Sequence, residues 1–295
     1  MGKGTSGKFP GTRYNARGLK TPIDPANECE AELIFLKDGR YYSQSWRRGS
    51  PPVFWQTQLN FIFTNHQVKE NASMDTPTYI LEEIIKRFEA ENVQIISLLH
   101  ENSEQENGIN IAYRDGVNSL ADSFSDICIQ FHTFDLNSCL KQKGFEQTID
   151  DYYALIGEHV NNSKFTIVEK ETGELLSEDD VQKTVFRFNC ADSLDRTNVA
   201  TFFYALYLTA KFVNLTQCRN FLKDDIDTFD VTDPRQCLKQ EVIDFLGNSF
   251  IISGNIISLM YTNTDAIKTH LIRKVMTPQS DNTKNDGSIS VQRRL

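Results

Sequence analysis

The residues that could do chemistry together lie in one short segment around Cys190. Cys190 and Arg196 are separated by five residues, and Thr197 follows the arginine directly. A cysteine thiolate is a strong nucleophile, and the planar guanidinium of an arginine can bind two phosphate oxygens at once. A nucleophile beside a phosphate-binding group points to attack on a phosphate ester, with Cys190 as the nucleophile.

The spacing itself has a physical reason, and it is typical of cysteine-based phosphatases. A strand delivers the cysteine to a short loop, whose backbone N–H groups curl around one phosphate. The helix that follows adds the partial positive charge of its N-terminus, and such surroundings lower the pKa of a thiol. We therefore expect Arg196 and the loop amides to hold the phosphate. The residues expected to bind substrate around the nucleophile are Ala191, Ser193, Leu194, Thr197 and Asn198.

Two carboxylates lie inside this segment, where an anion is expected to bind. Carboxylates beside a phosphate are costly unless they transfer protons or hold the arginine. We predict that Asp192 donates a proton to the leaving oxygen, and that Asp195 shares this role or orients Arg196. The spacing alone also fits a buried thiol at the end of a strand, with Asp195 capping the next helix.

The elements around the segment alternate between strands and helices, which predicts an α/β layered fold with the loop between a strand and a helix. Lys37-Asp38-Gly39 is typical of a hairpin turn, and Thr76-Pro77 is typical of a helix start. The expected strands are 31–36, 41–46, 93–99, 127–133, 164–170 and 183–189. The expected helices are 76–89, 114–124, 136–159, 195–213, 242–253 and 256–261.

Composition excludes some classes of protein. The chain has 295 residues with a formal net charge of −9, which argues against a nucleic-acid binder. No stretch approaches the roughly 18 uninterrupted apolar residues of a spanning helix, and the apolar run 199–213 is predicted to be a buried helix. No signal peptide is visible, although Gly2 and Ser6 fit a short myristoylation pattern.

The six cysteines contain no C-x-x-C pair, so a zinc site is not predicted, and neither a metal nor another cofactor is expected. Without a secretion signal they indicate reduced thiols in the cytosol. They are Cys29, Cys128, Cys139, Cys190, Cys218 and Cys237.

The segment 187–198 resembles the signature R-x-N-C-x-D-C-L-D-R-T-N of Sac-domain phosphoinositide phosphatases. Phe188 stands where threonine is usual, and Ser193 replaces the second cysteine, as in a plant branch of the family that carries a WW module. If Cys190 is the reactive residue, the replacement of the second cysteine by Ser193 does not remove the nucleophile. Further blocks of the family are matched at 11–18, 27–30, 46–55, 131–135, 253–255 and 261–264.

The resemblance implies a catalytic domain with a central mixed sheet flanked by helices. It also implies metal-independent removal of a phosphate from the inositol ring of a membrane lipid, by a cytoplasmic protein associated peripherally with membranes. Arg13, Arg17 and Arg48 become candidates for contacts to the substrate or to the loop. Arg47 is a weaker candidate because neighbours in a strand face opposite ways. His132 and Asp135 are expected to buttress the core.

Two other functions remain open: an inert phosphoinositide-binding relative, and a protein tyrosine or dual-specificity phosphatase. The latter typically has glycine in its loop, which this chain lacks. Neither the ring phosphate removed, nor the oligomeric state, nor any protein partner is predicted.

Small and polar residues predict a flexible N-terminus at 1–10 and a disordered tail at 277–295, and the resemblance places a catalytic domain at 11–276 between them. The lobe that usually precedes the catalytic domain is expected to be missing. We further expect the arginines of the matched blocks to converge on one face around Cys190, leaving the acidic excess elsewhere.

Overall fold

A computed structural model describes residues 18–19, 25–59, 64–68, 76–224, 226 and 233–276. The segments predicted at 1–10 and 277–295, together with Arg13 and Arg17, lie outside these residues. The chain divides into two compact units, of which the first comprises Met1–Gln142 and Ser163–Ser193. The second comprises Lys143–Asn162 and Leu194–Leu295. The predicted domain boundaries stay a prediction.

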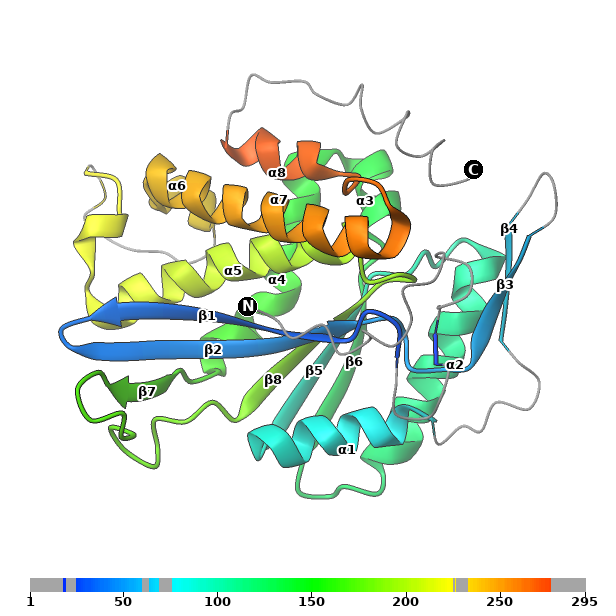
Figure 1. Cartoon of the computed structure of the whole chain (residues 1–295), viewed down its shortest axis with the longest axis horizontal. Helices are drawn as coiled ribbons and strands as arrows, with labels where there is room; N and C mark the ends of the chain where they lie inside the picture. Colours follow the sequence, from blue (N-terminus) through cyan, green and yellow to red (C-terminus); the bar gives the residue numbers. More distant parts are fainter. Residues whose placement is uncertain are drawn as a thin grey trace. The chain divides into compact units, whose positions relative to one another are not determined.

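The first unit is built on a mixed sheet whose path runs β1-β2-β8-β5-β6, with β7 paired to β2 (Figure 1). Strands β2, β8, β5 and β6 are parallel, whereas β1 and β7 are antiparallel to β2. The strand bounds are β1 Cys29–Lys37, β2 Arg40–Gly49, β5 Asn92–Ser97, β6 Cys128–Thr133, β7 Thr166–Glu169 and β8 Thr184–Asn189. A separate hairpin is formed by β3 Trp55–Leu59 and β4 Thr64–Val68.

The hairpin predicted at Lys37-Asp38-Gly39 joins β1 to β2. Asp38 has φ 49° and Gly39 has φ 75°, the left-handed pair that a tight turn between twisted strands requires. The helices of this unit are α1 Thr76–Phe88, α2 Glu104–Ala121 and α3 Leu136–Lys143. The last residue of α3, Lys143, already belongs to the second unit. The predicted α/β class with a mixed sheet and helices is confirmed.

The core of the first unit lies between this sheet and its helices. Helix α1 buries Ile80, Leu81 and Ile84 on the face that its apolar spacing predicts. These side chains pack in one cluster with Val93 and Ile95 of β5. Ala191, in the segment after β8, belongs to the same cluster, so the core packs directly against the start of the candidate loop.

The second unit consists of helices α4 Phe145–Asn162, α5 Asp195–Thr216, α6 Pro234–Cys237, α7 Gln240–Thr262 and α8 Thr269–Met276, with a 3₁₀ turn at Arg219–Phe221. Helix α5 is buried almost all round, as predicted from its apolar run. Tyr152 of α4 donates a hydrogen bond of 3.0 Å to the carbonyl of Ala200 on α5.

Four predicted helices have different bounds. The helix predicted at 136–159 is two helices, since Gly144 adopts φ 78° between α3 and α4. Those predicted at 242–253 and 256–261 are one helix, α7, in which Gly254 provides room for Asn198. A Cβ at Gly254 would lie 2.5 Å from Asn198 Nδ2. The helix predicted to start at 114 starts at Glu104, with two acidic residues in its first turn.

Candidate active site

Four parallel strands of the first unit end together at the edge where Cys190 lies. The register pairs Asn189, the last residue of β8, with Gly49 of β2 on one side and Ser97 of β5 on the other. Leu98 donates a backbone hydrogen bond of 2.7 Å to the carbonyl of Asn189. Ligands of open α/β sheets bind at the carboxyl ends of strands, and Cys190 follows β8 at such an end.

The residue before the cysteine anchors the segment. Asn189 donates from its side-chain amide to the carbonyl of Gly49 at 2.8 Å, and it accepts from the Tyr113 hydroxyl at 3.3 Å. Cys190 is 3% exposed, and Ala191 and Asp192 are also buried. The cysteine is therefore presented from a fixed strand end.

The carbonyl groups after Cys190 are bound by side chains from the segments on either side of β1 and β2. The Ser50 hydroxyl donates to the carbonyl of Ala191 at 2.7 Å, and Ser50 in turn accepts from the Gly18 N–H at 3.1 Å. The side-chain amide of Asn27 donates to the carbonyl of Asp192 at 2.7 Å. The carbonyl oxygens of two successive peptide units of the loop therefore accept hydrogen bonds from side chains outside the loop.

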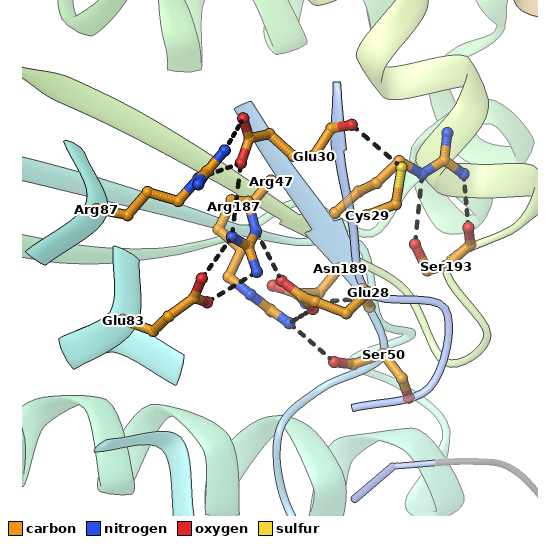
Figure 2. Close-up of polar contacts among 12 residues, drawn as sticks. Glu28, Cys29, Glu30, Arg47, Ser50, Glu83, Arg87, Arg187, Asn189 and Ser193 are labelled. Atoms are coloured by element: carbon orange, nitrogen blue, oxygen red, sulfur yellow. Dashed lines mark hydrogen bonds and ion pairs between the residues drawn. The ribbon is translucent and has the colours of Figure 1, made fainter. Parts of the chain in front are cut away.

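A third carbonyl, that of Ser193, accepts from Nη2 of Arg48 at 2.5 Å, while Arg48 Nε lies 3.5 Å from the Ser193 hydroxyl oxygen. Ser193 is fully buried and has φ 53°, a left-handed conformation that costs a non-glycine residue about 1–2 kcal/mol. The contacts of Ser193 are drawn in Figure 2. The C=O and N–H of a trans peptide point in opposite directions, so binding the carbonyls of Ala191 and Ser193 turns the N–H groups of these two peptide units toward the other side. The N–H of the peptide unit between them, that of Ser193, donates to the carbonyl of Cys190 at 3.3 Å.

The neighbouring arginines bind carboxylates instead of the loop. Arg187, fully buried on β8, donates from Nη2 to Glu28 Oε2 at 2.6 Å. Arg47 donates to Glu28 Oε1 at 3.2 Å and to Glu83 at 2.9 Å (Figure 2). Arg47 and Arg48 thus bind different partners, as the alternation of side chains along a strand predicts. Burial lowers the pKa of Arg187, but the charges of Glu28 and Tyr113 and their hydrogen bonds with the guanidinium together outweigh it and raise the pKa above its ordinary value.

Arg47 and Arg187 therefore form a buried ion-pair network with Glu28. The predicted convergence of arginines around Cys190 is wrong for these two, because their guanidinium groups are occupied by carboxylates. Gly49 makes the network possible, since a Cβ at this position would lie 2.8 Å from Arg187 Nη2 and closer still to Glu28.

The remaining predicted residues belong to the first turns of α5 in the second unit. Asp195 accepts the Ile267 N–H at 2.6 Å, and Asn198 donates to the carbonyl of Phe250 at 2.9 Å. Arg196 is half-buried. The buried hydroxyl of Thr197 has no hydrogen-bond partner among the residues that the structure describes.

The predicted site residues thus fall into two groups. The first unit brings together Cys190, Ala191, Asp192, Ser193 and Arg48. The second unit contains Leu194, Asp195, Arg196, Thr197 and Asn198.

Sequence reasoning missed the residues that hold the loop from outside. Asn27 and Ser50 lie in blocks that match the family pattern, and this match is the only feature of the sequence that could have identified them as loop-binding residues. It also missed the pair at the ends of β5 and β6, where His100 Nδ1 lies 2.5 Å from Asp135 Oδ2. Burial raises the pKa of Asp135, but hydrogen bonds from Ser138 and from His100 outweigh it and hold the pKa below its usual value.

Comparisons with known proteins connect this geometry to one family. Residues 5–141 match the family described as the SacI homology domain. The chain is 28% identical over 273 residues to the polyphosphatidylinositol phosphatase INP53 of Saccharomyces cerevisiae, an alignment that covers 91% of this chain and 23% of that protein. It is 25% identical over 268 residues to the phosphoinositide phosphatase SAC8 of Arabidopsis thaliana, covering 89% of this chain and 41% of that protein.

A third relative is the phosphatidylinositol-3-phosphatase SAC1 of S. cerevisiae, which is 23% identical over 273 residues. That alignment covers 89% of this chain and 40% of SAC1. The chain therefore spans less than half the length of each of these curated relatives.

Proposed function

We propose that this chain, which belongs to the Sac-domain family, hydrolyses a phosphate ester on the inositol ring of a phosphoinositide lipid. Its relatives are named as phosphatases of such lipids. The observation that supports the proposal best is the binding of three consecutive carbonyls, those of residues 191–193, by Ser50, Asn27 and Arg48. This arrangement directs the N–H groups of the first and third of these peptide units away from the protein donors, as an anion-binding loop beside Cys190 requires, while the Ser193 N–H donates to the Cys190 carbonyl.

The proposed reaction has two steps. The Cys190 thiolate attacks phosphorus in line, an S–P bond forms, and the P–O bond to the inositol ring breaks. Asp192 supplies the proton to the leaving ring oxygen, and Arg196 with the loop amides stabilises the charge on the nonbridging oxygens. A water molecule then attacks the phospho-cysteine, returns a proton to Asp192 and releases inorganic phosphate with the thiolate.

The two aspartates are assigned by their contacts. The Asp195 carboxylate accepts the backbone N–H of Ile267, so it is committed to holding the segment before α8. Asp192 has its backbone carbonyl bound by Asn27, directly after Cys190 and Ala191, and we assign its side chain as the acid. The hydroxyl of Thr197, which finds no hydrogen-bond partner in the part of the chain that the structure describes, is proposed to bind a group at the start of α5.

The proposed site of action is the cytoplasmic surface of a membrane, where phosphoinositide headgroups are accessible. Its test is phosphate release from vesicles that contain each mono- and polyphosphoinositide in turn. We expect release from at least one lipid, its loss in Cys190→Ser, and its retention in Cys128→Ser, a matched change at an exposed cysteine. Vesicle binding without release from any lipid would favour the inert binding protein instead.

A further inference from the structure

His100 lies in the loop that follows β5, next to the segment that begins with Cys190 after β8. Strands β5 and β8 are parallel neighbours, and their last residues pair in register. Leu99 and Ala191 belong to the same buried cluster, so one core holds the residue before His100 and the residue after Cys190. His100 is therefore placed at the strand edge where the proposed substrate binds.

The imidazole ring of His100 is fixed by Asp135, which follows β6 on the other side of β5. Nδ1 lies 2.5 Å from Asp135 Oδ2, and Ser138 Oγ lies 3.3 Å from the same nitrogen. The buried Asp135 carboxylate also accepts the backbone N–H groups of Glu101 at 3.2 Å and of Ser138 at 3.0 Å. Such bonds favour the ionised carboxylate, so Nδ1 carries a proton and Asp135 orients the ring.

The second ring nitrogen of His100 faces no protein group. No hydrogen bond to Nε2 occurs among the residues that the structure describes, and the side chain is 37% exposed. The main chain is held as well, because the His100 N–H donates to Glu106 Oε2 at 2.7 Å. A ring that is fixed at Nδ1 and open at Nε2 is preorganised to bind a ligand.

The charged groups around His100 are acidic. They lie in the loops after β5 and β6 and in the first turn of α2, and they are Glu101, Glu104, Glu106 and Asp135. No lysine or arginine occurs at 98–112 or at 134–140. The two glutamates of α2 already complement the partial positive charge of that helix start. These carboxylates would repel a second phosphate, whereas an uncharged hydroxyl can bind Nε2.

We propose that His100 Nε2 accepts a hydrogen bond from a hydroxyl of the inositol ring while the phosphate ester of that ring lies at Cys190. Asp135 is the residue that positions the imidazole, and a neutral imidazole is sufficient for this contact. The acidic surroundings then select a lipid with a hydroxyl, and not a second phosphate, at the ring position that faces His100. This inference rests on the proposed function and adds a specificity-determining residue to it.

The test is calorimetric binding of soluble, short-chain phosphatidylinositol monophosphates and bisphosphates to the full chain carrying Cys190→Ser, from which the proposed turnover is removed. In this background, we expect His100→Ala to weaken binding of the best monophosphate about tenfold, and binding of the bisphosphates by less. His100→Gln keeps a side-chain acceptor and should lose less affinity than His100→Ala. His159→Ala, at a histidine of α4 that the proposal does not use, is the matched control and should leave binding unchanged.

A double-mutant cycle tests the role of Asp135. Asp135→Asn should weaken monophosphate binding about threefold when His100 is present, and should have no further effect in His100→Ala, because it acts through the ring. Full additivity of the two changes would overturn the positioning role, since a loss of stability alone does not depend on the imidazole.

The outcomes separate this inference from the proposed function. Equal affinities of the His100→Ala and His159→Ala proteins for every lipid would overturn the inference, even if the unchanged chain releases phosphate. A larger loss for bisphosphates than for monophosphates would also overturn it, because His100 would then bind a phosphate. The expected losses of binding, with no phosphate release by the unchanged chain, would contradict the proposed function alone.

Discussion

Nη2 of Arg48 donates a 2.5 Å hydrogen bond to the carbonyl oxygen of Ser193, three residues beyond Cys190. This contact joins the end of β2 to a residue in a left-handed conformation. Together with the bonds from Ser50 and Asn27, it fixes the direction of the peptide units after the cysteine. The shape of the loop is therefore imposed by residues far away in the sequence.

Replacing Arg48 should loosen the loop. Arg48→Lys keeps the charge but loses the planar fork, so we expect a loss of about 1–3 kcal/mol in stability. Phosphatase activity should fall at least about tenfold, because the loop amides are no longer held in place. Arg40→Lys, the same change at an exposed pair on the same strand, should leave stability nearly unchanged, because exposed salt bridges contribute little. Thermal unfolding and vesicle turnover measure both effects, and equal behaviour of the two variants would contradict the role of Arg48.

Removing the charge of Glu28 should be strongly destabilising. Glu28→Gln leaves Arg187 buried without its carboxylate, a change that typically costs about 3–5 kcal/mol. Glu30→Gln removes a more exposed partner of Arg87 and should cost less than about 1 kcal/mol. Urea unfolding of both variants tests this. A Glu28→Gln protein as stable as Glu30→Gln would show that the network is not a stabilising element.

The sequence predicts the fold class and much of the detail of individual elements. The spacing of Ile80, Leu81 and Ile84 predicts α1, and Asp38-Gly39 predicts the first hairpin, because these signals are local. Glycines were harder to interpret. Gly144 separates two helices, whereas Gly254 lies inside one and makes room for Asn198, and only tertiary contacts distinguish these cases.

The sequence predicts the strand before Cys190 and the helix that starts at Asp195, but not the residues that surround the segment between them. The partners of its carbonyls lie more than 140 positions away, and no local pattern identifies them. The same limit applies to Arg187, whose carboxylate partner Glu28 is 159 positions distant. An arginine beside a predicted phosphate loop is equally compatible with a ligand contact and with an ion pair until its neighbours are known.

Asp135 should make stability depend on pH in acid. Its folded pKa lies below the ordinary value, so the unfolded state binds its proton first as the pH falls. The stabilisation is therefore complete above about pH 4, decreases below it, and is lost once the pH has fallen through the folded pKa. Asp135→Asn should be less stable than the unchanged chain at pH 7, and the difference should shrink at pH ~3. A difference that does not change with pH would contradict this assignment.

Lys211 should make stability rise with pH in alkaline solution. Burial lowers its pKa from the ordinary 10.5 to about 8, and its ammonium donates to the carbonyl of Val160 at 2.6 Å. Between these two values the unfolded chain binds more protons, so the contribution of Lys211 to stability rises with pH across this window. Lys211→Met should remove that rise, which unfolding measured at pH ~8 and ~10 would reveal. A variant with the same pH profile as the unchanged chain would exclude Lys211 as its source.

The central claim is that catalysis proceeds through a phospho-cysteine at residue 190. Its most direct test is rapid acid quenching of the protein during turnover of phosphoinositide vesicles, followed by mass spectrometry of the peptide that contains Cys190. We predict phosphate on the Cys190 sulfur in the unchanged chain, and neither modified peptide nor turnover in Cys190→Ser. Continued phosphate release by Cys190→Ser, or phosphate trapped on another residue, would contradict the account.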